Sequence, residues 1–275
     1  MVDIKFIENN VYINAKDLDL RQTLDCGQAF RFKTDENGMW TGVVKQKVLK
    51  LYKKDEYIVI ENLSEDEFFN DFYEYFTFFI DYEKIKEILS ADDILKQAIS
   101  MSPGIRLLNQ EKFETICSFI FSQNNNIPRI KGIIERFCEQ FGEKLQDGFY
   151  AFPTAEKIAQ LTVDDLSPIR AGFRAKYIID AAKKCADNLV LEDLYSLDID
   201  SARTALMTVK GVGPKVADCT LLFGFGFHSA FPMDVWMKRA MATLFDNKLP
   251  DGFEDCAGII QQYIFQYART EKLSF

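Results

Sequence analysis

The sequence predicts an α+β fold in which an N-terminal antiparallel sheet packs on a mostly helical region. Two patterns carry this prediction. Residues 1–62 alternate apolar and polar side chains and are rich in β-branched and aromatic residues, which is typical of short strands. From Ser64 onward, apolar side chains recur at helical spacing, which indicates amphipathic helices. Because no long linker or internal repeat divides the chain, we expect the sheet and the helices to pack as one α+β unit.

The expected strands follow one another between turn signals. The ENN and DENG stretches are rich in the residue types that favour turns. Several short strands in close succession favour an antiparallel sheet. We expect them within 6–17, 28–35, 39–54 and 57–62.

The expected helices begin with a capping box. Ser64 precedes acidic residues and then an apolar run, the signature of a helix N-terminus. We therefore expect an N-terminal part over residues 1–100, made of the sheet and the helices that follow it, and a helical part over residues 101–275. Further helices are expected over 83–100, 112–124, 128–141, 155–161, 174–188, 200–208, 215–225, 234–245 and 253–269.

The charge of the whole chain argues against a nucleic-acid partner. The net charge is −9, whereas phosphate binding usually leaves a basic footprint. The charge is uneven, however, because residues 1–100 carry 13 basic and 20 acidic side chains while residues 101–240 carry 17 of each. The central region can therefore hold a local basic face, and an acidic protein with solvated charges is the alternative.

Composition narrows the class of protein further. The chain has no run of eighteen apolar residues, so we expect no membrane span. Its first ten residues lack the basic and then apolar pattern of a signal peptide, so we expect a cytoplasmic protein. The six cysteines show no C-x-x-C spacing and the only histidine is His228, so we expect no metal site.

Residues 200–226 are predicted to form a helix, a tight turn and a second helix. In the turn VKGVGP, Gly211 and Gly213 allow positive φ and close backbone approach. Pro214 suits the first position of the next helix. Such a turn points free backbone N–H groups outward at a helix N-terminus, where an anion can bind. Glycine turns between helices are also common without any ligand, so both interpretations stay open.

Lys215 and Asp234 are the candidate catalytic residues. The positive end of a helix disfavours an ammonium group, so a lysine there can serve as a nucleophilic amine that forms a Schiff base. A solvated surface lysine is the alternative. Asp234 follows Pro232 and precedes a helical run, where it can cap the helix and still face a cleft. The two residues can converge if both helix N-termini face one site.

Together these motifs resemble a known family. Helix–GVGPK–helix followed by PMDVW is similar to the helix-hairpin-helix DNA glycosylase superfamily, and the rest of the chain resembles its 8-oxoguanine DNA glycosylase/AP lyase family. The resemblance implies an N-terminal antiparallel sheet domain packed on a mostly α-helical helix-hairpin-helix glycosylase domain. The motifs occur in the expected order over nearly the whole chain, as GQAFRF (27–32), GIRLLNQ (104–110), FIFSQNNNIPRI (119–130), GFRAKY (172–177), KVADC (215–219) and QQYIFQYAR (261–269).

The resemblance also implies roles for single residues. Lys215 falls on the catalytic amine and Asp234 on the catalytic carboxylate, while Phe173 falls on the wedge that fills the gap in the duplex. The pocket for the flipped base would be formed by Gly27, Phe119, Cys219, Gln261 and Phe265. Contacts to DNA would be made by Asn124, Asn125, Asn126, Arg129, Phe173, Arg174, Lys210, Gly211, Gly213 and Trp236.

Taken singly, these residues have plainer interpretations. The asparagine triplet can be a loop that ends a helix, the two pocket phenylalanines can be core, and Cys219 can be a small buried apolar residue. Gln261 can be a solvated helix residue, and the two arginines can be surface charges. Three positions also depart from the family pattern: Phe173 stands where tyrosine is common, Trp236 where histidine can occur, and Lys210 where proline often precedes G-V-G.

The implied activity is removal of 8-oxoguanine from double-stranded DNA, with cytosine opposite the lesion. Lys215 would form a Schiff base at C1′, and β-elimination would then nick the strand. No metal or organic cofactor is implied, and we expect a monomer in the bacterial cytoplasm, associated with the nucleoid. Three alternatives are an alkylated-base glycosylase, which typically lacks the lysine, an endonuclease III-like enzyme, which usually carries a four-cysteine cluster, and a non-catalytic DNA-binding module.

Overall fold

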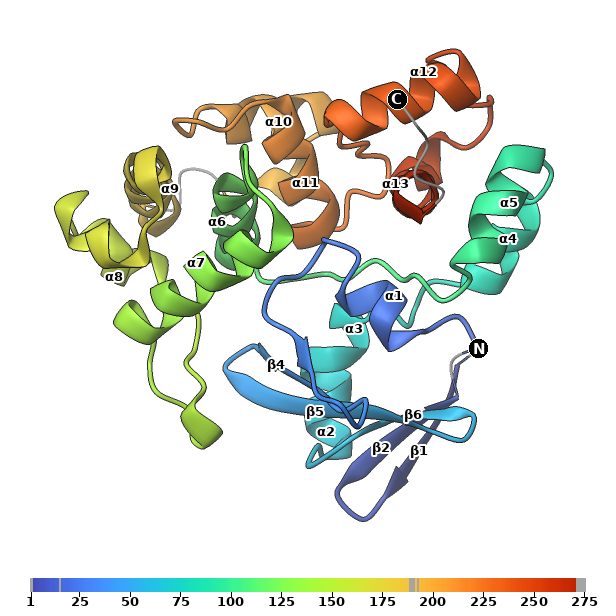
Figure 1. The fold of residues 1–275 in the computed structure, drawn as a ribbon, viewed down its shortest axis with the longest axis horizontal. Coiled ribbons are helices and arrows are strands. Elements are labelled where there is room, and N and C mark those ends of the chain that lie inside the picture. The colour runs from blue at the N-terminus through green and yellow to red at the C-terminus, as the bar shows by residue number, and fades with distance from the viewer. Residues whose placement is uncertain (1, 15, 188–190, 192, 271–275) are drawn as a thin grey trace.

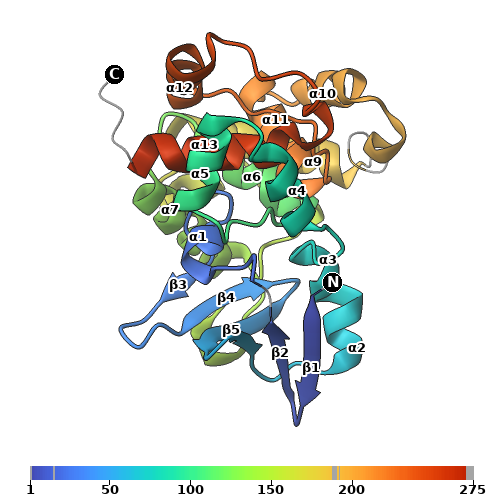
Figure 2. The same ribbon diagram turned by 90° about the vertical axis from the view of Figure 1, so that its right-hand side faces the viewer.

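The computed structural model describes residues 2–14, 16–187, 191 and 193–270 of the chain. A six-stranded sheet forms one end of the molecule and a layered group of helices forms the other (Figures 1 and 2). This is the α+β architecture that the sequence predicts. None of the described helices is both long enough and apolar enough to span a bilayer.

The sheet is antiparallel throughout, with strand order β1-β2-β6-β5-β4-β3. Its register places Val11 opposite Ile60, and Ile60 opposite Leu51. Directly opposite residues of neighbouring strands share one face of the sheet. All three side chains are fully buried, so this is the face that packs on the core. The strands are β1 (Asp3–Ile7), β2 (Asn10–Asn14), β3 (Lys33–Thr34), β4 (Trp40–Val44), β5 (Lys47–Lys54) and β6 (Tyr57–Ile60).

Two local predictions in this region are wrong. A short helix, α1 (Leu20–Leu24), interrupts the stretch that was expected to hold only strands, and Asp19 caps it by accepting a hydrogen bond from the Gln22 N–H. The strand expected over 28–35 is reduced to β3. Gln28 explains this, because its buried side chain bonds the Arg106 carbonyl and the Leu108 N–H and so ties this segment to another part of the chain. In both views α1 lies between the sheet and the helices.

The helices follow the predicted pattern closely. The capping box is confirmed, since Ser64 and Glu67 each bond the other's backbone N–H. The helix expected over 83–100 is divided, because Asp92 caps a new helix by accepting from the Ile94 and Leu95 N–H groups. Residue 188, the end of another expected helix, lies outside the described residues. The helices are α2 (Glu65–Glu67), α3 (Tyr73–Tyr75), α4 (Tyr82–Leu89), α5 (Asp93–Met101), α6 (Lys112–Ser122), α7 (Ile127–Phe141), α8 (Ala155–Ala159), α9 (Ala175–Ala186), α10 (Ile199–Met207), α11 (Pro214–Gly224), α12 (Val235–Phe245) and α13 (Ala257–Thr270), with a π-helical turn (Phe68–Phe72) between α2 and α3.

Helices α6 and α11 form the centre of the helical layer and run antiparallel. Lys215, at the start of α11, contacts Ser122 at the end of α6, and Gln110, just before α6, donates its N–H to the carbonyl of Phe223 at the end of α11. Both helices are buried along most of their length. Both helices therefore run from one side of the helical layer to the opposite side.

The segment between α5 and α6 joins the helices to the chain that leaves the sheet. Arg106 is fully buried there, and its guanidinium donates to the carbonyls of Phe76, Thr77 and Ile80. The same group lies 4.3 Å from the ring centre of Tyr82. These bonds fix the path between the sheet and α4 against the helical core. The proposed division of the chain at residue 100 stays a prediction.

Candidate active site

The hairpin between α10 and α11 presents free backbone donors. Gly211 has φ +80°, and a Cβ atom there would lie 2.4 Å from Cδ2 of Tyr177, so only glycine fits. Gly213 has φ −101°, so of the two turn glycines Gly211 alone uses the positive φ that both residues allow. Gly213 instead leaves open space, with nothing within 4 Å of where a Cβ would stand. The N–H groups of Gly211, Gly213 and Lys215 have no hydrogen-bond partner among the described residues.

Pro214 occupies the first helical position of α11, as predicted, and Lys215 the second. The Lys215 ammonium lies 3.4 Å from the Ser122 hydroxyl and 5.1 Å from the ring centre of Phe119. The Ser122 hydroxyl donates to the Phe119 carbonyl at 2.7 Å, so it can accept from the lysine. The side chain is half-buried and directed at a cavity rather than spread over the surface.

Asp234 has two roles in the geometry. It is the N-cap of α12, where its Oδ1 accepts from the Met237 N–H at 2.7 Å. It also lines the same cavity as Lys215. Two helix N-termini, those of α11 and α12, therefore meet at one site, and a cap of this kind fixes the carboxylate in place.

The cavity between these helices holds about 50 Å³. Phe119 and Phe223 stack on one side with their ring centres 5.4 Å apart. Gly27 enters with φ +99°, and burial raises the pKa of the Cys219 thiol to about 11. All seven residues predicted for catalysis and the base pocket meet here, and the full lining is Cys26, Gly27, Phe119, Lys215, Cys219, Phe223, Pro232, Asp234, Gln261, Gln262 and Phe265.

The predicted DNA-contact residues divide into exposed and buried groups. Phe173 is 51% exposed, and Trp236 is 49% exposed. Arg174 is buried, and its guanidinium donates to the carbonyls of Ala171, Gln123 and Asn124. Burial and the nearby charge of Arg129 lower the pKa of Arg174. The structure thus places Arg174 as a support for the loop before α7.

The asparagine triplet follows the loop interpretation in part. Asn126 caps α7 by accepting from the Arg129 N–H, and the Asn125 amide donates to the Phe121 carbonyl. Asn124 is exposed and adopts φ +47°. Asn124 and the exposed Arg129 remain available to a ligand. Lys210 is exposed, but its ammonium lies 3.7 Å from Asp180, which also accepts from its N–H.

Four cavity residues escaped the sequence analysis, namely Cys26, Phe223, Pro232 and Gln262. Gln262 lies within the stretch QQYIFQYAR (261–269), and Cys26 directly precedes Gly27. These positions in or beside the family motifs are the signal that could have marked them. Ser122, which contacts the lysine, lies within the stretch FIFSQNNNIPRI (119–130), but no role was predicted for it from the sequence.

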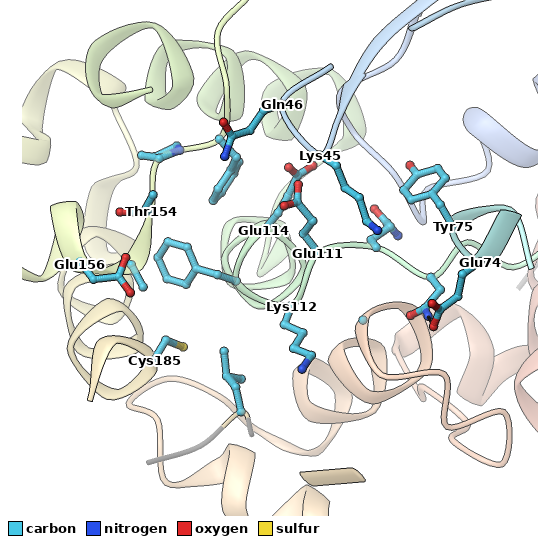
Figure 3. A pocket seen from close by; sticks show the side chains of 18 of the residues that line it. Lys45, Gln46, Glu74, Tyr75, Glu111, Lys112, Glu114, Thr154, Glu156 and Cys185 are labelled. Carbon is cyan, nitrogen blue, oxygen red and sulfur yellow. Dashed lines mark hydrogen bonds between the residues drawn. The ribbon is translucent and has the colours of Figure 1, made fainter. Parts of the chain in front are cut away.

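A larger cavity of about 550 Å³ lies at the opposite ends of α6 and α11. Glu111, Lys112 and Glu114, from the N-terminus of α6, point into it (Figure 3). None of the predicted site residues lines it. Its lining is acidic, and burial raises the pKa of Glu114 despite an ion pair with Arg31. An acidic cavity of this kind does not suit a nucleic acid.

Comparison with known proteins identifies the family to which the chain belongs. Residues 10–116 match the family model described as 8-oxoguanine DNA glycosylase, N-terminal domain, and residues 117–251 match the HhH-GPD superfamily of base excision DNA repair proteins. An N-glycosylase/DNA lyase of Saccharomyces cerevisiae is 32% identical over 258 residues, which cover 82% of this chain and 68% of the yeast protein. The chain belongs to the 8-oxoguanine DNA glycosylase/AP lyase family.

Solved structures agree with this membership of the 8-oxoguanine DNA glycosylases. The Clostridium acetobutylicum 8-oxoguanine glycosylase/lyase, in complex with double-stranded DNA containing cytosine opposite 8-oxoguanine, superposes with a TM-score of 0.91 at 39% identity, and the match covers 99% of both chains. A DNA-3-methyladenine glycosylase of Bacillus subtilis is 28% identical over 181 residues, covering 64% of this chain and 60% of that protein. The match to the 8-oxoguanine enzyme therefore has a higher sequence identity and covers more of the chain than the match to the DNA-3-methyladenine glycosylase.

Proposed function

We propose that this chain is a bifunctional DNA glycosylase/AP lyase that flips and excises 8-oxoguanine from duplex DNA in base excision repair. The observation that carries the proposal is the convergence of Lys215, Asp234 and Gln261 on one cavity, beside a hairpin with free backbone N–H groups. The relatives named N-glycosylase/DNA lyase and 8-oxoguanine glycosylase/lyase support the same activity. A monofunctional glycosylase would have no use for an amine at this place.

The hairpin and the surface around it would hold the DNA. The backbone N–H groups of Gly211 and Gly213 would bind phosphate at the positive end of α11, with Lys210 and Trp236 at the edge of the contact. Such a site needs few basic side chains, which reconciles DNA binding with a net charge of −9. Phosphate contacts of this kind set the register of the protein on the duplex.

A flipped base leaves a gap in the duplex, and the enzyme must offset a cost of a few kcal/mol in lost stacking and pairing. Phe173 is exposed and can stack in that gap, with Asn124 beside it. Arg129 would donate to the acceptor edge of the orphaned cytosine. Arg174 would also donate to the cytosine. To do so, it must either release one of its carbonyl partners or use an N–H that the loop carbonyls do not bind.

The chemistry would start at the Lys215 amine. Its lone pair forms a bond to C1′ as the bond from C1′ to the base nitrogen breaks, and the electron pair leaves with the base, which takes up a proton. The Asp234 carboxylate would stabilise the positive charge that develops on the sugar. Opening of the sugar ring gives a Schiff base between Lys215 and C1′. Loss of a proton from C2′ then expels the 3′ phosphate and nicks the strand.

Recognition of the lesion would rest on the walls of the cavity. The carbonyl of Gly27 would accept from the N7 hydrogen that 8-oxoguanine has and guanine lacks. Gln261 would bond the Watson–Crick edge of the flipped base, as is usual for enzymes of this kind. Phe119, Cys219 and Phe265 would pack on its faces.

Borohydride trapping tests the activity. Incubation of the protein with a duplex containing 8-oxoguanine opposite cytosine, followed by borohydride, is expected to give a covalent adduct, because borohydride reduces a Schiff base. Free 8-oxoguanine and a nicked strand are expected without borohydride. Failure to release the base would overturn the proposal, and release without an adduct would restrict it to a monofunctional glycosylase. We further propose that the protein acts as a monomer on the nucleoid in the cytoplasm.

A further inference from the structure

Three buried side chains in the wall of the cavity form a hydrogen-bonded chain, which we name the amide relay: Cys26, Gln262 and Gln261. The Cys26 thiol lies 3.6 Å from Oε1 of Gln262, and Nε2 of Gln262 lies 2.7 Å from Oε1 of Gln261. The relay ends on the carbonyl of Pro232, 3.2 Å from Nε2 of Gln261. The three side chains expose 3–5% of their surface, so each polar atom needs a partner inside the protein.

The direction of the relay is fixed from its Pro232 end. A backbone carbonyl can only accept, so Gln261 must turn its NH₂ group towards Pro232 and its oxygen towards Gln262. Gln262 must then donate to that oxygen and present its own oxygen to Cys26. Burial raises the pKa of the Cys26 thiol to about 11, so the thiol keeps its hydrogen at neutral pH and can donate. It shares that hydrogen with the Thr23 carbonyl, 3.4 Å away.

The relay leaves Gln261 with one N–H and one oxygen lone pair that no other described residue uses. Guanine and 8-oxoguanine match this pair, because O6 accepts and N1–H donates. An adenine edge carries the opposite order, because its N6 amino group donates and its N1 accepts. An amide turned by 180° would match adenine instead, so the orientation of Gln261 decides which purine edge can bind.

We propose that Gln262 is a positioning residue that, together with the Pro232 carbonyl, holds the Gln261 amide in the orientation that accepts a guanine-type edge and rejects an adenine-type edge. The proposal rests on the proposed function. Gln262 also lines the cavity, but each end of its amide makes a bond within the relay, and the effect proposed here passes to the base through Gln261. Cys26 supports the far end more weakly, because its hydrogen is shared.

The test compares two lesions that differ only at the edge in question. 8-Oxoguanine and 8-oxoadenine share the C8 oxygen and the N7 hydrogen. Each lesion is placed opposite cytosine, and the single-turnover rate for 8-oxoguanine is divided by the rate for 8-oxoadenine. This ratio is measured for wild type and for Gln262→Met, which keeps the length of the side chain and removes both hydrogen bonds. We expect the ratio to fall about tenfold in the variant, the scale of one mismatched buried hydrogen bond.

The matched control is Gln266→Met, the same substitution one turn along α13, at a residue whose Oε1 has no partner among the described residues. Gln266→Met is expected to keep the wild-type ratio of rates even if its melting temperature falls as much as that of Gln262→Met. Cys26→Ala should lower the ratio by a few fold and Cys26→Ser should restore it, since a hydroxyl can donate. This pair decides the matter if Gln262→Met does not fold.

The proposal is overturned if Gln262→Met keeps the wild-type ratio or loses both activities equally. If Gln262→Met does not fold, the proposal is overturned when Cys26→Ala and Cys26→Ser give the same ratio. A wild-type protein that excises neither lesion would instead break the proposed function.

Discussion

The two cavities at opposite ends of α6 and α11 differ in both size and chemistry. The larger one, about 550 Å³, meets the N-terminus of α6, where Glu111 and Glu114 already compensate the positive helix end. The smaller one, about 50 Å³, meets the N-termini of α11 and α12, where an amine, a carboxylate and free N–H groups converge. The active site that we propose is therefore the smaller cavity, and what marks it is an uncompensated helix end beside a reactive side chain rather than its volume.

The strongest test of this comparison is removal of the amine. Lys215→Gln keeps a polar side chain of similar length and cannot form a Schiff base. We expect complete loss of the borohydride adduct and of strand nicking on a duplex with 8-oxoguanine opposite cytosine. Trapping at the wild-type rate would show that the nucleophile lies elsewhere.

The next largest effect is expected at Asp234. Asp234→Asn preserves the cap on α12, because asparagine caps as well as aspartate, and it removes the negative charge. The loss of one preorganised electrostatic group is worth about 2–4 kcal/mol, so we expect excision to slow by about 100-fold while DNA affinity is kept. Single-turnover excision and a binding titration measure the two separately. Unchanged excision would reduce Asp234 to a helix cap.

A smaller effect is expected at Gly27. Its φ of +99° is unfavourable for alanine, although a Cβ would have room, 3.6 Å from Ile127. Gly27→Ala should therefore displace the carbonyl through the backbone and weaken lesion binding by about ten- to a hundredfold, the cost of one mismatched buried hydrogen bond.

The lesion analogue 7-deaza-8-oxoguanine isolates the same contact without any mutation, because it has no N7 hydrogen. Wild-type protein is expected to bind it as weakly as the Gly27→Ala variant binds 8-oxoguanine. Equal wild-type affinity for the analogue and for 8-oxoguanine would exclude the Gly27 carbonyl as the discriminating group.

The smallest effect is expected in the large cavity. Glu111→Gln removes one charge from its acidic lining, more than a helix length from Lys215, since the eleven residues of α6 span roughly 16 Å. Substitutions of this kind usually change the free energy of unfolding by no more than about 0.5 kcal/mol. Because Glu111 also lies far from the reacting groups, we expect excision to stay near the wild-type rate. A large loss of activity at an unchanged melting temperature would give the large cavity a part in the reaction.

Local signals in the sequence predicted much of this geometry. The capping box at Ser64, the proline at the start of α11 and the cap at Asp234 are confirmed because each depends on neighbours within a few residues. The contacts that the structure adds join residues that lie far apart in the sequence. Gln262 meets Cys26 across 236 positions, and Arg174 is buried against a loop about 50 positions away. No local pattern encodes such a pair, so neither could be found from the sequence.

The same long separation has a consequence for protein synthesis. The cavity takes its walls from Gly27, Phe119, Lys215, Asp234 and Gln261, so α13 supplies the last wall long after the amine has been made. A chain still emerging from the ribosome carries the lysine and the aspartate without a pocket to receive a base. Cleavage of a glycosidic bond thus becomes possible only after α13 has been synthesised and has closed the pocket that binds the base.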